Sequence, residues 1–184
     1  FITENVVEVK GESYTAPHIL IATGGEIVRP TIPGAEYGID SNGFFKLREV
    51  PETVAVVGAG YIAVEIAGVL NGLGATTHLA FRKETFLRNF DEMVIKGLTE
   101  SYEHQGITLH PNSVPKEVLK TDTGYQLVFE NGKTLLVDEI VWAVGRRPKL
   151  EGLGLEKTSV TVNSHGAIEV DKYQNTSQAG IYAV

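Results

Sequence analysis

The chain has 184 residues, of which 42% are hydrophobic and 21% are charged, a composition typical of a globular protein rather than a disordered or fibrous one. Its formal net charge of −7 disfavours nucleic-acid binding, because nucleic-acid-binding proteins carry a basic balance. The absence of cysteine excludes disulfide scaffolds, zinc–thiolate sites, iron–sulfur ligation and a cysteine nucleophile. No apolar run reaches the roughly 18 residues of a transmembrane helix, so we expect no membrane partner.

The first part of the chain predicts two short strands and a loop. Residues 6–9 and 18–22 are strand-like, and Lys10-Gly11-Glu12 is predicted to form a turn between them. Residues 26–43 are rich in proline and glycine and are predicted as a loop or linker. Because the chain begins at Phe1 and stops within another strand-like run, we expect it to be a piece of a longer protein.

The next part alternates strand and helix patterns. The apolar run at 53–57 predicts a strand buried on both faces of a parallel sheet, and a helix is predicted over 61–73. A second strand is predicted at 76–81. The helix carries an apolar stripe that we expect to face the core, made of Ile62, Ile66, Val69, Leu70 and Leu73.

The remaining elements complete an α/β pattern. Asp91 is a predicted N-cap for a helix that runs to about His104, and a short strand is predicted at 107–109. Three alternating runs predict an antiparallel meander, in which Asn131-Gly132 is a strong hairpin signal. We also expect strands at 139–144, at 160–162 paired with 167–170, and at the end of the chain.

These elements predict an α/β fold with a Rossmann-like parallel sheet of about four strands over residues 30–148. Helices are expected on one face of this sheet and the three-stranded meander on the other. Strand 53–57 should therefore have only parallel neighbours in its sheet.

A glycine pattern joins the first buried strand to its helix. Residues 54–68 read VAVVGAGYIAVEIAG, in which Gly58 permits a tight turn and Gly60 leaves room for a pyrophosphate against the backbone. The small residues Ala63 and Ala67 let the helix lie close to the sheet. Free N–H groups and the helix dipole favour an anion there. The pattern predicts a dinucleotide site, the alternative being a turn that serves packing only.

The end of the next strand indicates which dinucleotide is bound. An NAD site places an acidic residue there, but this strand ends at Phe81 and is followed by the cations Arg82, Lys83 and Arg88. A guanidinium matches the geometry of a phosphate, so this cluster favours NADPH over NADH through the 2′-phosphate. The alternative is a solvated basic face. We expect Phe81→Glu, together with loss of the arginines, to shift the preference toward NADH.

Five segments together resemble the bacterial glutathione reductases, which belong to the flavin-dependent pyridine nucleotide-disulfide oxidoreductases. They are ILIATGG (19–25), GAGYIAVEIAG (58–68), FRKETFLR (81–88), WAVGRRP (142–148) and DKYQNTSQAGIYAV (171–184). The resemblance implies that residues 1–29 end the first FAD-domain segment and that residues 30–148 form the NADPH-binding domain. Residues 149–184 would then begin the returning, truncated FAD-domain and central segment.

The resemblance implies further cofactor contacts. Tyr61 would cover the nicotinamide pocket, and Glu65 would lie near the nicotinamide carboxamide and pair with a lysine outside this chain. Gly145 would approach the nicotinamide half, and Arg146 would lie close to both flavin and nicotinamide. Backbone and wall contacts would come from Ala59 and Ile62. Some of these residues also have a structural alternative. Tyr61 could be an ordinary aromatic residue at a helix start, Glu65 an acid that stabilises the first helical turn, and Arg146 a salt-bridging surface residue.

The resemblance also implies the reaction of the whole protein. Hydride would pass from NADPH through FAD to a redox disulfide and then to oxidised glutathione, in a cytoplasmic homodimer. The two cysteines and the His–Glu pair that this reaction needs are not in the chain, so we expect it to hold no catalytic residue and no metal, and to bind FAD weakly. Its five histidines match no acid–base site.

Other functions remain open at this point. The parent protein could be a mercuric, trypanothione or dihydrolipoamide type of flavin disulfide reductase, although Arg82 and Arg88 disfavour the NAD-dependent last of these. The chain could also be a non-catalytic NADPH-sensing module, or a structural domain that binds nothing in isolation.

Overall fold

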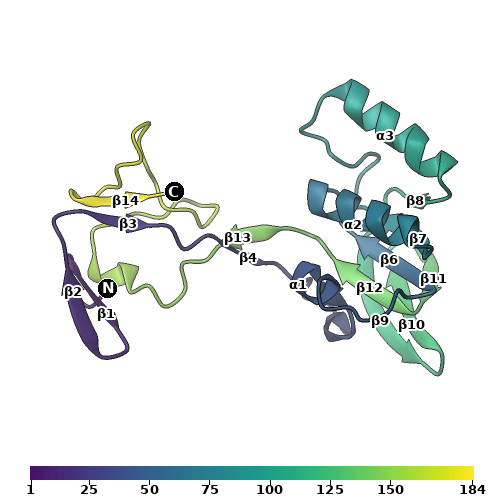
Figure 1. Ribbon diagram of the computed structural model, residues 1–184, viewed down its shortest axis with the longest axis horizontal. Helices are drawn as coiled ribbons and strands as arrows, with labels where there is room; N and C mark the ends of the chain where they lie inside the picture. The colour runs from purple at the N-terminus through teal and green to yellow at the C-terminus, as the bar shows by residue number, and fades with distance from the viewer. The chain divides into compact units, whose positions relative to one another are not determined.

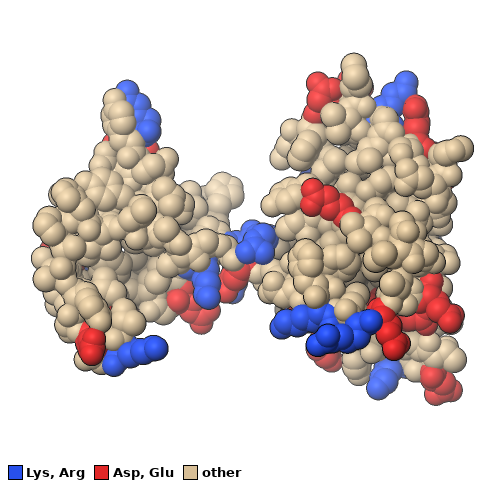
Figure 2. All heavy atoms as spheres, viewed as in Figure 1, with Lys and Arg blue, Asp and Glu red and all other residues tan.

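The computed structural model describes residues 1–184 and divides into two compact units. The first unit comprises Phe1–Glu26 and Arg146–Val184, and the second comprises Ile27–Gly145. Acidic and basic side chains are intermixed on the visible face of each unit (Figure 2). None of the helices is both long and apolar enough to cross a membrane.

The second unit is built on a five-stranded parallel sheet. Its strands lie in the order β5 (Ile39–Asp40), β12 (Glu139–Trp142), β6 (Thr53–Val57), β7 (Thr76–Ala80) and β8 (Thr108–His110). Every neighbouring pair is parallel, including both neighbours of β6. The predicted fold class is confirmed, and the sheet has one more strand than expected.

Successive side chains of β6 point to opposite faces of the sheet and pack into two separate cores. Val54 and Val56 face α2 (Tyr61–Gly72) and α3 (Glu92–His104), whereas Ala55 and Val57 face the opposite side. That side is covered by an antiparallel sheet in the order β11 (Thr134–Val137), β10 (Gly124–Phe129) and β9 (Pro115–Thr121). Figure 1 shows the two helices and this meander on opposite sides of the parallel sheet.

Small residues bring α2 close to the sheet, as predicted. Ala63 and Ala67 are fully buried, and α3 packs against α2 through Tyr102, whose hydroxyl donates to the Val64 carbonyl at 2.7 Å. The predicted apolar stripe is wrong at two positions, Val69 and Leu73, which are 48% and 60% exposed. They line an apolar groove between α1 and α2 instead of the core.

The predicted linker over residues 26–43 contains regular structure. It holds a 3-10 turn, Ala35–Tyr37, the edge strand β5, and the short helix α1, Ser41–Phe44. Asp40 caps α1 by accepting from the N–H groups of Asn42 and Gly43. The buried Trp142 indole donates to the Ala35 carbonyl at 2.8 Å, which holds this segment against the sheet.

The first unit begins with a hairpin whose second strand, residues 12–15, was not predicted from the sequence. β1 (Val6–Val9) pairs with β2 (Glu12–Thr15), and the turn consists of Lys10 and Gly11 alone. Both turn residues have positive φ, 54° and 84°, as a two-residue hairpin turn of type I′ requires. Glu12 therefore belongs to a strand and not to the turn.

The remainder of the first unit is built on a parallel pair, β3 (Ile19–Ile21) and β14 (Ile181–Ala183), which lie side by side in Figure 1. A 3-10 turn, Leu155–Lys157, precedes β14. β4 (Gly25–Ile27) and β13 (Arg146–Pro148) pair in the segments that join the units.

The pairing predicted between 160–162 and 167–170 is present, but it is limited to one antiparallel bridge, Val162–Ile168, and two backbone hydrogen bonds. Side-chain oxygens accept hydrogen bonds from backbone N–H groups that a longer strand pair would use. Asn163 accepts from the N–H groups of His165 and Ala167, and the Ser177 hydroxyl accepts from the N–H of Thr161.

Candidate functional site

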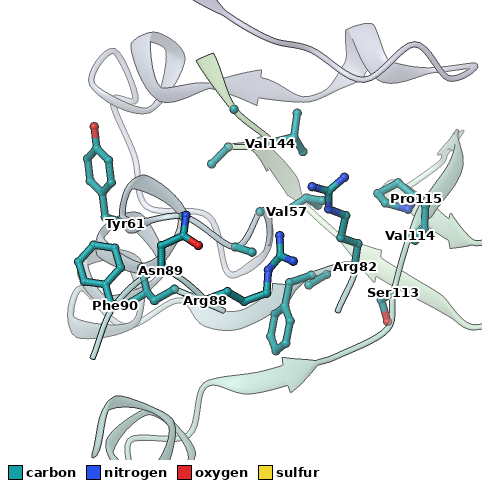
Figure 3. Close-up of a pocket in the computed structure, with 18 residues that line it drawn as sticks. Val57, Tyr61, Arg82, Arg88, Asn89, Phe90, Ser113, Val114, Pro115 and Val144 are labelled. Atoms are coloured by element: carbon teal, nitrogen blue, oxygen red, sulfur yellow. The ribbon is translucent and has the colours of Figure 1, made fainter. Parts of the chain in front are cut away.

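A cavity of about 450 Å³ lies in the second unit, at the carboxyl ends of β6, β7 and β12. Ligands of open parallel sheets bind at this end of the strands. Eighteen residues line the cavity, namely Val57–Tyr61, Ala80–Arg82, Leu87–Phe90, Ser113–Pro115 and Ala143–Gly145. Figure 3 shows the labelled side chains around it.

The two glycines of the turn after β6 have different surroundings. A Cβ on Gly58 would lie 2.2 Å from the Ala143 carbonyl oxygen, so the protein's own packing requires glycine there. A Cβ on Gly60 would meet no protein atom within 4 Å, and its φ of −90° is open to any residue. Since neither packing nor backbone conformation explains Gly60, the space above it is available to a ligand that approaches the backbone.

The first turn of α2 opens onto the same cavity. Gly60 is the N-cap and offers no side chain, so no side-chain hydrogen bond caps the helix. The first N–H groups of a helix lack partners within the helix, and the dipole adds partial positive charge. This helix end can bind an anionic group such as a pyrophosphate.

Two of the three predicted cations lie at the cavity. The guanidinium groups of Arg82 and Arg88 converge on it from different segments (Figure 3). Neither forms an ion pair, because the ion pairs of the chain are Arg29–Asp40 and Arg147–Glu26. Lys83 is exposed and does not line the cavity. Two unpaired guanidinium groups next to an uncapped helix provide a site for a second anionic group.

A strained residue holds Arg88 in this place. Leu87 has a φ of +52°, which is uncommon for a residue with a branched side chain, and its side chain is buried in the core. Its N–H donates to the Ala59 carbonyl at 2.7 Å. The glycine turn and the arginine loop are therefore joined by a backbone hydrogen bond.

The expected effect of Phe81→Glu stays a prediction, and the burial of Phe81 argues against it. Phe81 is only 3% exposed and packs edge-to-face against Phe86 in the core, with ring centroids 5.6 Å apart. In the combined variant, which also lacks Arg82 and Arg88, a carboxylate at this position would be largely buried without a cation partner, and such burial is costly. The substitution would destabilise the fold before it could change cofactor preference.

The other predicted site residues are found in three places. Ala59, Tyr61 and Gly145 line the cavity, and Tyr61 lies at its edge in Figure 3. Ile62 and Glu65 line the separate apolar groove between α1 and α2. Arg146 belongs to the first unit, where its guanidinium donates to the Gly25 carbonyl.

Several cavity residues were not predicted from the sequence. Asn89 and Phe90 follow Arg88 in the same loop, and Ser113, Val114 and Pro115 come from the connection between β8 and β9. The Ser113 N–H donates to the Phe81 carbonyl at 2.9 Å, which brings this connection to the end of β7. No local pattern marks these residues, because the sheet topology alone brings them to the cavity.

The model of the pyridine nucleotide-disulphide oxidoreductase family matches residues 1–184. The chain belongs to this family. Glutathione reductase from Schizosaccharomyces pombe is 48% identical to it over 167 residues, which cover 89% of this chain and 36% of that protein. The chain thus spans about a third of the length of this relative, and the resemblance stated from the sequence is confirmed.

Solved structures share the fold of this chain. The HOCl-induced flavoprotein disulfide reductase RclA from Escherichia coli matches with a TM-score of 0.93 and 29% identity, over 100% of this chain and 43% of that one. LpdA from Mycobacterium tuberculosis matches with a TM-score of 0.85 over 98% of this chain and 42% of its own. At 24% identity, LpdA supports the fold alone.

Proposed function

We propose that residues 30–148 are the NADPH-binding domain of a glutathione-disulfide reductase. The observation that carries this proposal is the pair of unpaired guanidinium groups, Arg82 and Arg88, at a cavity that also receives the uncapped N-terminus of α2. NADPH carries a pyrophosphate and a 2′-phosphate. The N-terminus of α2 offers a site for the first, and the two guanidinium groups offer a site for the second.

Each part of the cavity has a defined role in this proposal. The first N–H groups of α2 bind the pyrophosphate, which approaches the backbone over Gly60. Arg82 and Arg88 bind the 2′-phosphate through charge-assisted hydrogen bonds. Tyr61 and Gly145 flank the nicotinamide half. When bound, NADPH supplies the hydride of the overall reaction.

The remaining steps belong to the whole protein. We propose that residues 1–29 and 149–184 are parts of the FAD side, and that the whole protein is a cytoplasmic homodimer that reduces oxidised glutathione. Glutathione as substrate is supported by 48% identity to a glutathione reductase, compared with 29% for RclA. The chain has no cysteine, so the redox disulfide must come from outside these residues.

Calorimetric titration of the chain with NADPH and NADH tests the cofactor preference. The double variant Arg82→Ala/Arg88→Ala should bind NADPH roughly a hundredfold more weakly, since each charge-assisted contact contributes about 1.5–3 kcal/mol before solvent screening. Its NADH affinity should hardly change, because NADH lacks the 2′-phosphate.

Lys83→Ala is the matched control, because it removes a neighbouring cation that does not line the cavity. It should leave both affinities within about threefold of wild type, as expected for one screened surface charge. Equal losses for NADPH and NADH in the double variant would overturn the 2′-phosphate assignment. A loss in Lys83→Ala as large as in the double variant would show that general surface charge governs binding.

A further inference from the structure

Two histidines lie side by side on the sheet, and neither lines the dinucleotide cavity. His78 is in β7 and His110 ends the neighbouring strand β8. His78 Nδ1 lies 3.0 Å from His110 Nε2, with ring centroids 5.2 Å apart and ring planes inclined by 49°. Both side chains are half-buried.

The register of the parallel sheet fixes this pair. His78 points to the same face as Ala80, which faces the meander, and Ala80 is the direct neighbour of His110 across β7 and β8. The Phe81 N–H donates to the His110 carbonyl at 3.0 Å, so the backbone at the end of β8 is also held. The two nitrogens are therefore brought together by the sheet and not by a mobile loop.

Burial disfavours the charged form of both rings. Burial lowers the pKa of His78, and burial together with His78 and Lys133 lowers the pKa of His110. Lys133 is the charged side chain that acts on His110. A neutral imidazole holds one N–H and one nitrogen lone pair, which is the form that binds metal ions.

We propose that His78 Nδ1 and His110 Nε2 form a two-nitrogen site for a divalent transition-metal ion such as Zn²⁺, Ni²⁺ or Cu²⁺. Imidazole nitrogens bind these ions at about 2.0–2.1 Å. At the roughly 90–109° angles of square-planar and tetrahedral coordination, two such nitrogens lie about 2.9–3.4 Å apart. The separation of 3.0 Å falls in this range without any change of the backbone.

Metal binding replaces the hydrogen bond between the rings. The bridging proton moves to the other nitrogen of its own ring, both rings stay neutral, and no net proton is released. No third His, Cys, Asp or Glu joins the pair, so water completes the coordination. Lys133 opposes the ion by charge repulsion.

Titration of the chain with Zn²⁺ alone, by calorimetry at neutral pH, tests this site. Wild type should bind one ion per chain, and His78→Gln and His110→Gln should each lower the affinity at least about tenfold, a change of roughly 1.4 kcal/mol. His104→Gln, which removes an exposed histidine of α3, should bind as wild type does. Lys133→Met should bind a few-fold more tightly.

Two further measurements on wild type do not depend on the folding of a variant. Titrations in buffers of different ionisation enthalpy should give the same heat, since no proton is exchanged. Binding should weaken as the pH falls, because protons compete with the metal for the same two nitrogens. The proposal is wrong if wild type binds no Zn²⁺, if the His78 and His110 variants match wild type, or if acidification leaves the affinity unchanged.

Discussion

The two units of the chain bury their apolar side chains to different extents. In the second unit both faces of the parallel sheet are covered, and residues such as Val54, Leu79 and Trp142 are fully buried. In the first unit β3 and β14 form a two-stranded pair, and one small cluster is buried while Leu20 is 59% exposed. Because burial of apolar surface is the main stabilising contribution, the second unit carries its own core and the first carries only part of one.

The largest expected effect tests this difference in core size. Leu79→Ala in the second unit should lower its free energy of unfolding by about 2–5 kcal/mol, because Leu79 is fully buried in a large cluster. Ile181→Ala in the first unit should cost less, since its small cluster can relax around the cavity. Urea unfolding followed by fluorescence of Trp142, the single tryptophan, reports on the second unit alone.

Hydrogen exchange of the amides of β3 and β14 reports on the first unit in the same samples. Leu79→Ala should leave that exchange unchanged, and Ile181→Ala should leave the Trp142 transition unchanged. A single transition that both substitutions shift equally would contradict the independence of the two cores.

A smaller effect is expected when the two glycines of the turn after β6 are replaced by alanine, because one is required by packing and the other faces open space. Gly58→Ala should destabilise the fold by about 1–3 kcal/mol or more, because its Cβ would meet the Ala143 carbonyl at 2.2 Å. Gly60→Ala should cost at most about 1 kcal/mol, since it only worsens an N-cap. Gly60→Ala should nevertheless weaken NADPH binding, because the methyl group occupies the space assigned to the pyrophosphate.

Thermal unfolding and NADPH titration of both variants separate these two roles. If Gly60→Ala bound NADPH as tightly as wild type, the open space above this residue would not be part of the cofactor site.

The smallest effect concerns pH and is confined to the second unit. Burial lowers the pKa of both His78 and His110, so the unfolded chain, with histidine pKa values near 6.5, binds protons more readily than the folded one. The stability of the second unit should therefore be complete above about pH 6.5 and decrease as the pH falls below it.

Melting curves in a chelating buffer between about pH 8 and 5 check this dependence. The double variant His78→Gln/His110→Gln should show a flatter profile, whereas His165→Gln in the first unit should follow wild type. An equal slope in wild type and the double variant would show that other groups cause the pH dependence.

Much of the second unit could be predicted from short-range patterns. The apolar run at 53–57, the Asp91 N-cap and the Asn131-Gly132 turn each identify an element by local physics. β5 could not be predicted, because a strand of two residues shows no alternation of apolar and polar side chains. Its pairing with β12 is set by the rest of the sheet. In the first unit, Lys10 adopts a left-handed turn that its residue type does not signal.

The candidate site divides in the same way. The glycine pattern predicts Gly58 and Gly60, and the position after a strand end predicts Arg82 and Arg88. Ser113, in contrast, reaches the cavity only because β8 lies next to β7. The pairing of His78 with His110 likewise requires the register of two strands. Sequence patterns predict what one segment does, and long-range pairing decides which segments meet.

The hydrogen bond from the Leu87 N–H to the Ala59 carbonyl has a consequence for how cofactor preference can change. It joins two backbone groups and uses no side chain of Arg82 or Arg88, the residues proposed to bind the 2′-phosphate. Arg82 and Arg88 can therefore be exchanged for other side chains while the loop keeps its place beside the phosphate turn. Under the proposed function, the backbone of the turn and of the loop holds the dinucleotide, and the side chains of Arg82 and Arg88 select NADPH over NADH. Substitutions at these two exposed positions should then change the preference while the backbone arrangement stays the same.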